Sequence, residues 1–256
     1  MGQSTVWGRE ALERRLEYVP ASPAELFIVP LLKERVERCL AEYARPAGTG
    51  RALDAGCGRQ PFRRLLESSG YHYHSLDVTQ NVDGTVGHIA PLDGELPPAL
   101  VAEAPFDLVL CTEVLEHVAD WPAAFTNLRR LAGDEGVVIL TCPQFYMLHE
   151  EPFDFWRPTG WAIRHYAERD GFRVVRLEQL GGAREVLGTM LGFCTFKPRR
   201  PGVLPYLYAR TLNVFKRLAH RFLRSRLSWA GPAELHGGTY LANFAVLRGG
   251  TPGGTP

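Results

Sequence analysis

One short glycine-containing segment is the part of the sequence best suited to holding a ligand. Residues 53–58 read L-D-A-G-C-G and stand between a predicted strand and a predicted helix. Two glycines let the backbone approach a ligand where a Cβ atom would collide with it. Nucleotide-phosphate loops need a further glycine or a lysine at fixed spacing, and here Arg-Gln-Pro follows instead. Asp54 adds a carboxylate, which repels phosphate and attracts a cation.

A second carboxylate follows at a useful distance. The next predicted strand ends at Asp77, nineteen residues after Gly58. An acid at about this spacing can accept hydrogen bonds from both hydroxyls of a ribose. Together these features predict a site for an adenosine-like ligand with a positively charged amino-acid portion. The alternative is a structural corner in which the glycines serve packing and Asp77 caps a helix, and the strand context and the two acids favour the ligand site.

The chain around these residues has the pattern of a layered α/β domain. Short apolar runs bounded by Gly, Asp or Pro alternate with amphipathic stretches, which is typical of a parallel sheet covered by helices on both faces. The expected strands are Arg51–Ala55, Tyr73–Asp77, Phe106–Cys111, Gly136–Cys142, Phe172–Leu177 and Thr239–Arg248. The expected helices are Phe27–Tyr43, Pro61–Ser69, Trp121–Ala132, Thr159–Asp170 and Leu204–Leu227.

Several motifs together resemble the class I S-adenosylmethionine-dependent methyltransferases. The segment L-D-A-G-C-G resembles the first motif of that family, and Asp77 matches its ribose-binding acid. Residues 106–118, F-D-L-V-L-C-T-E-V-L-E-H-V, resemble the fourth-strand motif. Residues 128–136 and 148–159 resemble segments on either side of the fifth strand in a bacterial branch, except that Pro158 stands where that branch usually has Tyr. The resemblance covers about residues 50–180 and the last strand, and it is specific for the cofactor rather than the acceptor.

The resemblance implies a Rossmann-like, doubly wound α/β fold with a seven-stranded sheet whose last strand is antiparallel. We expect an N-terminal helical segment at 1–50 and an S-adenosylmethionine-binding core at 51–182. A basic helical insertion is expected at 183–236, and the last strand and a disordered tail at 237–256.

The resemblance also implies a cofactor site, carried over position by position. Asp54, Ala55, Gly56, Cys57 and Gly58 are expected at the methionine end, Asp77 at the ribose and Val78 beside the adenine. Cys111, Thr112 and Glu113 are expected under the cofactor, near its sulfonium. The family usually has an acid before a Leu-Pro pair that contacts the adenine amino group. We assign this role to Asp93 rather than to His88.

A sulfonium methyl group is already activated, so its transfer needs mainly alignment of the nucleophile, the methyl carbon and the sulfur. A general base is needed only for a hydroxyl or a protonated amine acceptor. The candidates are His117, His149, Glu150 and Asp154. We prefer His149, because it follows the fifth strand at the edge where the acceptor must arrive. Its alternative role is a loop anchor.

Two further features belong to this segment after the fifth strand. Glu150, Glu151, Asp154 and Arg157 are expected to form an ion-paired loop. Phe153, Phe155 and Trp156 are expected to build a hydrophobic wall, in the core or in the acceptor pocket.

Residues 113–117, E-V-L-E-H, have a second interpretation as a metal site. Glu113, Glu116 and His117 share one face of a helical turn, and His149 or His165 can close the site around a divalent ion. Metal-dependent relatives such as small-RNA 2′-O-methyltransferases and ubiquinone-pathway O-methyltransferases have a similar string. We favour helix capping and packing for Glu116 and His117, and so we predict no metal.

The basic residues are concentrated late in the chain. Residues 186–233 hold nine of the 29 Lys and Arg residues and none of the 28 Asp and Glu residues, so the rest of the chain has a net charge of −8. In the helical pattern of 204–227, one side has Leu204, Tyr208, Leu212, Phe215, Ala219 and Phe222. The opposite side has Arg210, Arg217, Arg221 and Arg224.

Four roles suit this basic insertion. Family insertions at this place often cover the substrate cleft, so the first expectation is a lid whose apolar face packs on the sheet domain. The others are recognition of an anionic acceptor by arginines, peripheral contact of 204–227 with an anionic membrane, and nucleic-acid binding. Nucleic acid is disfavoured because there is no recognised RNA-binding module.

Composition sets the remaining bounds. The 256 residues are 45% hydrophobic and 22% charged with a net charge of +1, which excludes a largely disordered chain and a general polyanion binder. The five cysteines include no C-x-x-C pair. Neither a signal peptide nor a membrane-spanning run is evident in the sequence. We therefore expect a cytoplasmic protein.

The predicted function is S-adenosylmethionine-dependent methylation of a small-molecule acceptor at oxygen, nitrogen or carbon, in natural-product or glycan metabolism. The alternatives are a metal-dependent RNA 2′-O-methyltransferase and a non-catalytic cofactor-binding regulatory subunit. The oligomeric state stays open.

Overall fold

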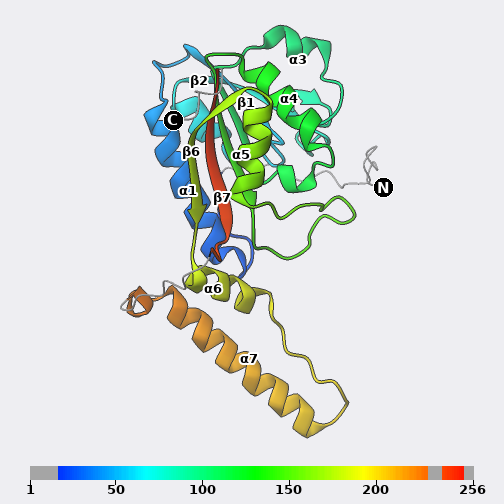
Figure 1. Cartoon of the computed structure of the whole chain (residues 1–256). Coiled ribbons are helices and arrows are strands. Elements are labelled where there is room, and N and C mark those ends of the chain that lie inside the picture. Colours follow the sequence, from blue (N-terminus) through cyan, green and yellow to red (C-terminus); the bar gives the residue numbers. More distant parts are fainter. Residues whose placement is uncertain (1–16, 230–237, 251–256) are drawn as a thin grey trace.

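A seven-stranded sheet forms the centre of the computed structural model, which describes residues 17–229 and 238–250 (Figure 1). The strands are β1 (Gly50–Ala55), β2 (Tyr71–Asp77), β3 (His88–Ile89), β4 (Leu108–Thr112), β5 (Val137–Pro143), β6 (Phe172–Leu180) and β7 (Ala242–Gly249). Their order is β3-β2-β1-β4-β5-β7-β6, and β7 runs antiparallel to both neighbours. The predicted doubly wound fold is therefore confirmed. The tail at 251–256, residues 1–16 and residues 230–237 lie outside the described residues.

Helices cover both faces of this sheet. They are α1 (Glu25–Glu42), α2 (Arg63–Ser68), α3 (Pro98–Glu103), α4 (Trp121–Ala132), α5 (Gly160–Arg169), α6 (Ala183–Phe193) and α7 (Val203–Arg224). Two short 3-10 helices, η1 (Leu115–His117) and η2 (Arg226–Trp229), complete the elements.

Successive strand residues enter two separate apolar layers. Leu53 and Val109 belong to the layer that contains the buried face of α4. Ala52 and Leu108, their neighbours in the chain, belong to the layer that contains the buried face of α1. Because side chains alternate along a strand, these two layers lie on opposite faces of the sheet. In a sheet of this kind, a ligand site is expected at the loops that follow the carboxyl ends of β1, β2 and β4.

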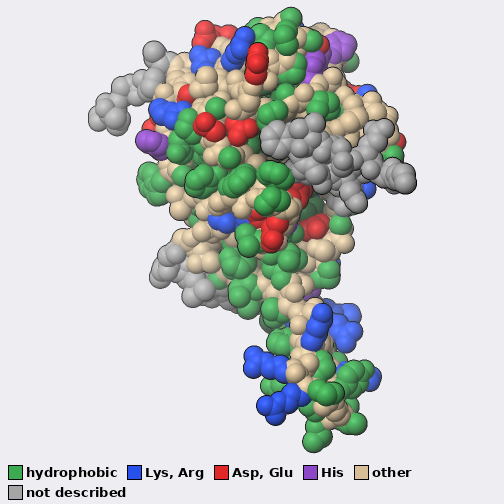
Figure 2. All heavy atoms as spheres, turned by 90° about the vertical axis from the view of Figure 1, so that its right-hand side faces the viewer, with side chains coloured by type: hydrophobic (Ala, Val, Ile, Leu, Met, Phe, Trp, Pro, Cys, Tyr) green, Lys and Arg blue, Asp and Glu red, His purple; other side chains and the backbone are tan. Residues whose placement is uncertain are grey.

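Residues 194–229 form an arm that extends beyond α6, away from the sheet (Figures 1 and 2). Its helix α7 is attached to α1: the ring of His220 meets Phe27 edge-on with centroids 5.3 Å apart, and His220 Nε2 lies 3.1 Å from the carbonyl oxygen of Pro23. Asn213 holds the irregular segment, donating to the carbonyl of Phe196 and accepting from its amide.

The expected packing of the α7 apolar face on the sheet domain is wrong. Leu204, Tyr208 and Phe215 are 78%, 68% and 64% exposed. The side of α7 that is buried against the rest of the protein carries Ala209 and His220. At 100° per residue this side lies across the helix from Leu204, so the stripe that packs is not the most apolar one.

Candidate active site

The glycine loop after β1 closes against the end of β2 and against the start of η1. The amides of Gly56 and Cys57 donate to the carbonyl oxygen of Leu76 at 2.7 and 3.1 Å. Gly56 has φ +75°, and a Cβ atom there would lie 2.2 Å from Cγ2 of Val114. Gly58 has φ +48°, but no atom of the described residues lies within 4 Å of its Cβ position. Packing therefore requires the first glycine, whereas the second borders open space.

We expect alanine at these two positions to separate stability from ligand binding. Gly56→Ala drives a methyl group into Val114 at a left-handed backbone position, and should lower the free energy of unfolding by about 2–3 kcal/mol. Gly58→Ala should lower the free energy of unfolding by only about 1 kcal/mol, through backbone strain. Its methyl group, however, occupies space in the cavity and should weaken cofactor binding. Chemical denaturation measures the first effect and calorimetric titration with the cofactor the second. Equal destabilisation by both substitutions would contradict this division.

Asp77 stands beside the glycine loop, at the end of β2. Its Oδ2 accepts from the amide of Gly58 at 2.7 Å and its Oδ1 accepts from the amide of Thr79 at 3.0 Å. Asp77 and the following Val78 both line the cavity in front of the loop. The glycine loop and Asp77, whose spacing in the sequence indicates one ligand site, are thus joined by a direct hydrogen bond.

Asp54 lies beneath the loop rather than at its surface. Its side chain is almost fully buried, and Tyr73 donates its hydroxyl hydrogen to Asp54 Oδ2 at 2.9 Å. Burial raises the pKa of Asp54 to about 7, the hydrogen bond from Tyr73 lowers it, and the negative charge of Asp77 raises it further. Burial therefore keeps a substantial part of this carboxyl group protonated at neutral pH.

A cavity of about 380 Å³ opens at the carboxyl edge of the sheet. The expected cofactor residues that line it are Gly56, Gly58, Asp77, Val78, Asp93 and Glu113. From the expected acceptor side it is lined by His117, Glu150, Phe153 and Phe155. Asp54, Ala55, Cys57, Cys111 and Thr112 belong to the adjoining β1, glycine loop and β4, and they do not line it. The cavity thus joins the two halves of the predicted site.

The structure brings Asp93, but not His88, to this cavity. Asp93 lines the wall, and its Oδ2 accepts from the amide of Asp120 at 3.1 Å. His88 Nε2 instead lies 3.1 Å from Oε2 of Glu103, which also faces Nδ1 of His74 at 2.8 Å. Of these two residues, only Asp93 is placed where a ligand in the cavity can contact it.

Glu113 turns the chain out of β4 while its carboxylate reaches back to β5. It has φ +52°, a left-handed conformation that is strained for a residue with a side chain. The Glu113 amide donates to the carbonyl of Thr141 at 3.1 Å, and Thr141 Oγ1 donates to Glu113 Oε1 at 2.9 Å. Burial raises the pKa of Glu113 to about 7, against the lowering effects of Thr141 and Arg157.

Neither strand cysteine near this wall is suited to covalent catalysis. Burial raises the pKa of the Cys111 thiol, and burial also raises the pKa of the Cys142 thiol, with the charge of Glu116 adding to both. A protonated thiol is a poor nucleophile, so both cysteines serve as small buried strand residues.

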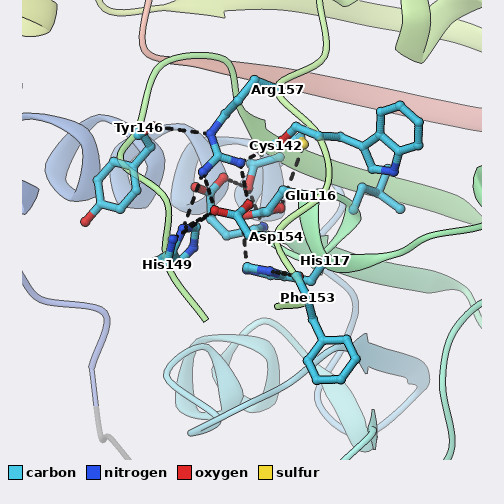
Figure 3. A network of polar contacts seen from close by, with 12 residues as sticks. Glu116, His117, Cys142, Tyr146, His149, Phe153, Asp154 and Arg157 are labelled. Carbon is cyan, nitrogen blue, oxygen red and sulfur yellow. Dashed lines mark hydrogen bonds and ion pairs between the residues drawn. The ribbon is translucent and has the colours of Figure 1, made fainter. Parts of the chain in front are cut away.

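A partly buried ion pair organises the segment after β5 (Figure 3). Arg157 donates from Nη1 and Nη2 to the two carboxylate oxygens of Asp154 at 2.6 and 2.8 Å, and it also donates to the carbonyls of Tyr146 and Met147. Burial alone raises the pKa of Asp154, but Arg157 and the His149 amide bind its oxygens and hold the pKa below its usual value. The ion-paired loop is thus present between Asp154 and Arg157.

His149 and His117 stand together beside this ion pair, with ring centroids 4.7 Å apart (Figure 3). His117 lines the cavity, and its Nδ1 donates to the carbonyl of Phe153 at 2.7 Å. His149 does not line the cavity, and its Nδ1 lies 3.2 Å from the carbonyl of Met147 and 3.3 Å from Oδ2 of Asp154. The preferred base is therefore one ring away from the cavity, and it makes the contacts of a loop anchor.

Glu116 is fully buried next to the two histidines. Among the residues that the structure describes, its Oε1 has no hydrogen-bond partner; it lies 3.7 Å from His117 Nε2, while Oε2 faces the Cys142 thiol at 3.8 Å. One ligand atom each from Glu116, His117 and His149 fit within 4.8 Å of one another. Burial, with the nearby charge of Glu113, raises the pKa of Glu116 well above its usual value. Neither Glu113 nor His165 belongs to this group.

Two residues without a distinct sequence signal support the glycine loop. Gln60 is buried with φ +56°, and its amide exchanges two hydrogen bonds of 2.9 Å with the carbonyl and hydroxyl of Thr85. It therefore ties the loop to the segment after β2. Val114 supplies the methyl groups that leave no room at Gly56. A single Gln and a single Val next to Glu113 do not identify this role from the sequence.

Comparison with known proteins agrees with this arrangement. Residues 25–184 match a family model described as a methyltransferase domain. A malonyl-[acyl-carrier protein] O-methyltransferase of Erwinia billingiae (strain Eb661) is 28% identical over 130 residues, which are 47% of this chain and 52% of that protein. The chain thus spans about half the length of this curated relative.

Solved structures share the fold at low sequence identity. The [4+2]-cyclase SpnF has 14% identity and a TM-score of 0.51, covering 96% of this chain and 100% of that one. A protein described as a sarcosine dimethylglycine methyltransferase, from Galdieria sulphuraria, has 12% identity and a TM-score of 0.50, covering 93% and 95%. At such identities the likeness concerns the fold alone, and the same fold can host different reactions.

Family membership therefore rests on the family model, which covers more than half of the chain. The chain belongs to the methyltransferase domain family, among the class I S-adenosylmethionine-dependent methyltransferases.

Proposed function

We propose that the protein transfers the methyl group of S-adenosylmethionine to oxygen, nitrogen or carbon of a small-molecule acceptor, in natural-product or glycan metabolism in the cytoplasm. The observation that carries this proposal is the shared cavity, where the glycine loop and Asp77 face His117, Glu150 and Phe153. Its volume of about 380 Å³ suits a small molecule rather than a macromolecular surface.

The residues present fit the cofactor. The proposed contacts that line the cavity are Gly56 and Gly58 at the methionine end, Asp77 at the ribose, Val78 and Asp93 at the adenine, and Glu113 near the sulfonium. Asp54 lies beneath the loop and is proposed to act on the methionine end through its charge. Ala55 and Cys57 complete the loop, and Cys111 and Thr112 support Glu113 from β4. A Cβ atom at Gly58 would enter the open space that this ligand needs. When bound, the cofactor supplies an electrophilic methyl group, and the chain orients it toward the acceptor.

For an acceptor that must lose a proton, His149 remains the proposed base. Its Nδ1–H can donate to Met147 or Asp154, which leaves Nε2 as the basic nitrogen. His117, at the cavity wall, is the second candidate, because the Phe153 carbonyl fixes the same tautomer there. The acceptor then needs to reach only one of two adjacent rings.

Incubation with methyl-labelled S-adenosylmethionine and fractionated metabolite pools tests this function. We expect a labelled small molecule, and we expect His149→Gln to lower the rate by roughly 100-fold with the cofactor dissociation constant unchanged. An equal loss in His117→Gln alone would move the base to that residue. Tight cofactor binding without transfer to any pool would instead favour the regulatory subunit considered above.

Metal-assisted methylation of an oxygen is a second candidate, favoured by the group of Glu116, His117 and His149. A buried carboxylate oxygen that has no hydrogen-bond partner within residues 17–229 and 238–250, next to two imidazoles, is a donor set that divalent transition metals accept. Chelator-treated protein titrated with Mn²⁺ tests it. Binding that Glu116→Gln abolishes and Glu151→Gln, at an exposed acid nearby, preserves would support the candidate. Full activity in chelator would exclude it.

A further inference from the structure

The arm carries an apolar surface that faces solvent. On α7 the side chains of Leu204, Leu207, Tyr208, Phe215, Leu218 and Phe222 are exposed. At 100° per residue they lie on one side of the helix and form a stripe along it, with Thr211 as a polar residue near the middle. A contiguous apolar stripe of this kind on a protein surface marks an interaction site.

Basic side chains border this stripe. Arg210, Arg217 and Arg221 are exposed along one edge of it, between the apolar stripe and the side that packs on the protein. No acidic residue occurs between 186 and 233, while the rest of the chain has a net charge of −8. Figure 2 shows the arm as a projection on which blue and green side chains mix. The molecule is therefore electrostatically polarised toward the arm.

A groove at the start of α7 is likewise lined by basic and apolar side chains. It has a volume of about 720 Å³ between the irregular segment and the helix. Lys197, Arg199 and Arg200 line it together with Leu204 and Tyr208. Several cations beside apolar side chains suit a phosphate headgroup with acyl chains below it.

We propose that the arm docks on the surface of an anionic phospholipid bilayer, with α7 lying in the plane of the interface. Helices with a basic edge and an aromatic and aliphatic face bind membranes in this way. Within the described residues, no helix is long and apolar enough to cross a bilayer, so the contact is peripheral.

The distribution of charge favours an anionic bilayer over a second copy of the chain as the partner of the arm. Two arms packed against each other would bring their cations together without an acid from either arm to offset them. An anionic bilayer offsets these cations, and it repels the negatively charged remainder of the chain, which orients the molecule with its arm toward the lipid. The proposal does not depend on the identity of the methyl acceptor.

Co-sedimentation of the full chain with vesicles tests the docking. We expect binding to vesicles of equal parts phosphatidylcholine and phosphatidylglycerol, loss of that binding at high salt, and little binding to phosphatidylcholine alone. Arg217→Gln/Arg221→Gln should lower the partition coefficient roughly 30-fold. Phe215→Ser should also lower it, without changing the melting temperature, because this side chain is mostly exposed.

The matched control is Arg64→Gln/Arg130→Gln, which makes the same change of charge at exposed positions of α2 and α4. It should change the partition coefficient by less than about threefold. Equal binding to neutral vesicles, or an equal effect of the control pair, would overturn the proposal. So would a dimer in sedimentation velocity that Phe215→Ser dissociates while vesicles retain no protein, because the stripe would then be a subunit interface.

Discussion

Asp77→Ala is expected to weaken S-adenosylmethionine binding by at least about 100-fold. The Asp77 carboxylate lines the cavity and already accepts from the amides of Gly58 and Thr79. Each of its oxygens has a second lone pair, so it can hold the glycine loop and two ribose hydroxyls together. Hydrogen bonds to a charged group contribute about 1.5–3 kcal/mol each, so losing two of them gives this factor. Isothermal titration calorimetry measures it.

The control for this result is Asp83→Ala. Asp83 is an exposed acid in the turn after β2, and it does not line the cavity, so the same loss of charge there should change the dissociation constant by less than about threefold. Circular dichroism shows whether both variants stay folded. Undiminished binding by a folded Asp77→Ala protein would remove the proposed cofactor site.

Elements with strong local signals were predictable from the sequence. Helix α4 begins and ends where its pattern predicts, because Asp120 caps it by accepting from the amide of Ala123 and Gly133 follows it with φ +64°. The two-residue strand β3 and the six-residue helix α3 were missed, since so few residues show no periodicity.

Helix α6 was missed for a different reason. Gly188 and Gly192 lower the helix propensity of 183–193. In the structure a Cβ atom at Gly188 would lie 2.4 Å from the ring of Phe27, and one at Gly192 would lie 2.5 Å from Cα of Ala24. The glycines that weaken the local signal are the ones that let α6 pack closely on the segment that begins α1. The sequence of α6 contains these glycines, but it does not show the neighbouring segment that requires them.

The cofactor half and the acceptor half of the site also differ in how far the sequence predicts their contacts. The contact of Gly58 with Asp77 follows from two adjacent parallel strands, so sequence spacing predicts it. The neighbouring rings of His117 and His149 come from different loops, and their approach depends on how Arg157 and Asp154 fold the segment after β5. Periodicity likewise shows that α7 is amphipathic, but it does not show which stripe packs.

Asp54→Asn is expected to stabilise the cofactor-free protein by about 4 kcal/mol at pH 8. Burial raises the pKa of Asp54 to about 7 from an ordinary 3.8, a difference of about 3 pH units at 1.36 kcal/mol each. Because the folded state binds the extra proton between about pH 4 and 7, the free energy of unfolding falls as pH rises through that window. Asparagine avoids this loss and can still accept from Tyr73. Urea unfolding at pH 5 and pH 8 should therefore show a gain that grows with pH.

The same substitution should weaken cofactor binding, because the charge that destabilises the empty fold is the one proposed to attract the cationic methionine end. At pH 8 we expect a saturating concentration of S-adenosylmethionine to raise the melting temperature of the wild type more than that of Asp54→Asn. The control Asp83→Asn makes the same change of charge at an exposed acid and should show neither effect. A stability gain independent of pH would contradict the raised pKa, whereas a gain that grows with pH but leaves cofactor affinity intact would remove Asp54 from the methionine end. The fold then tolerates an unfavourable charge on Asp54, beneath the glycine loop, because the bound cationic cofactor can neutralise it.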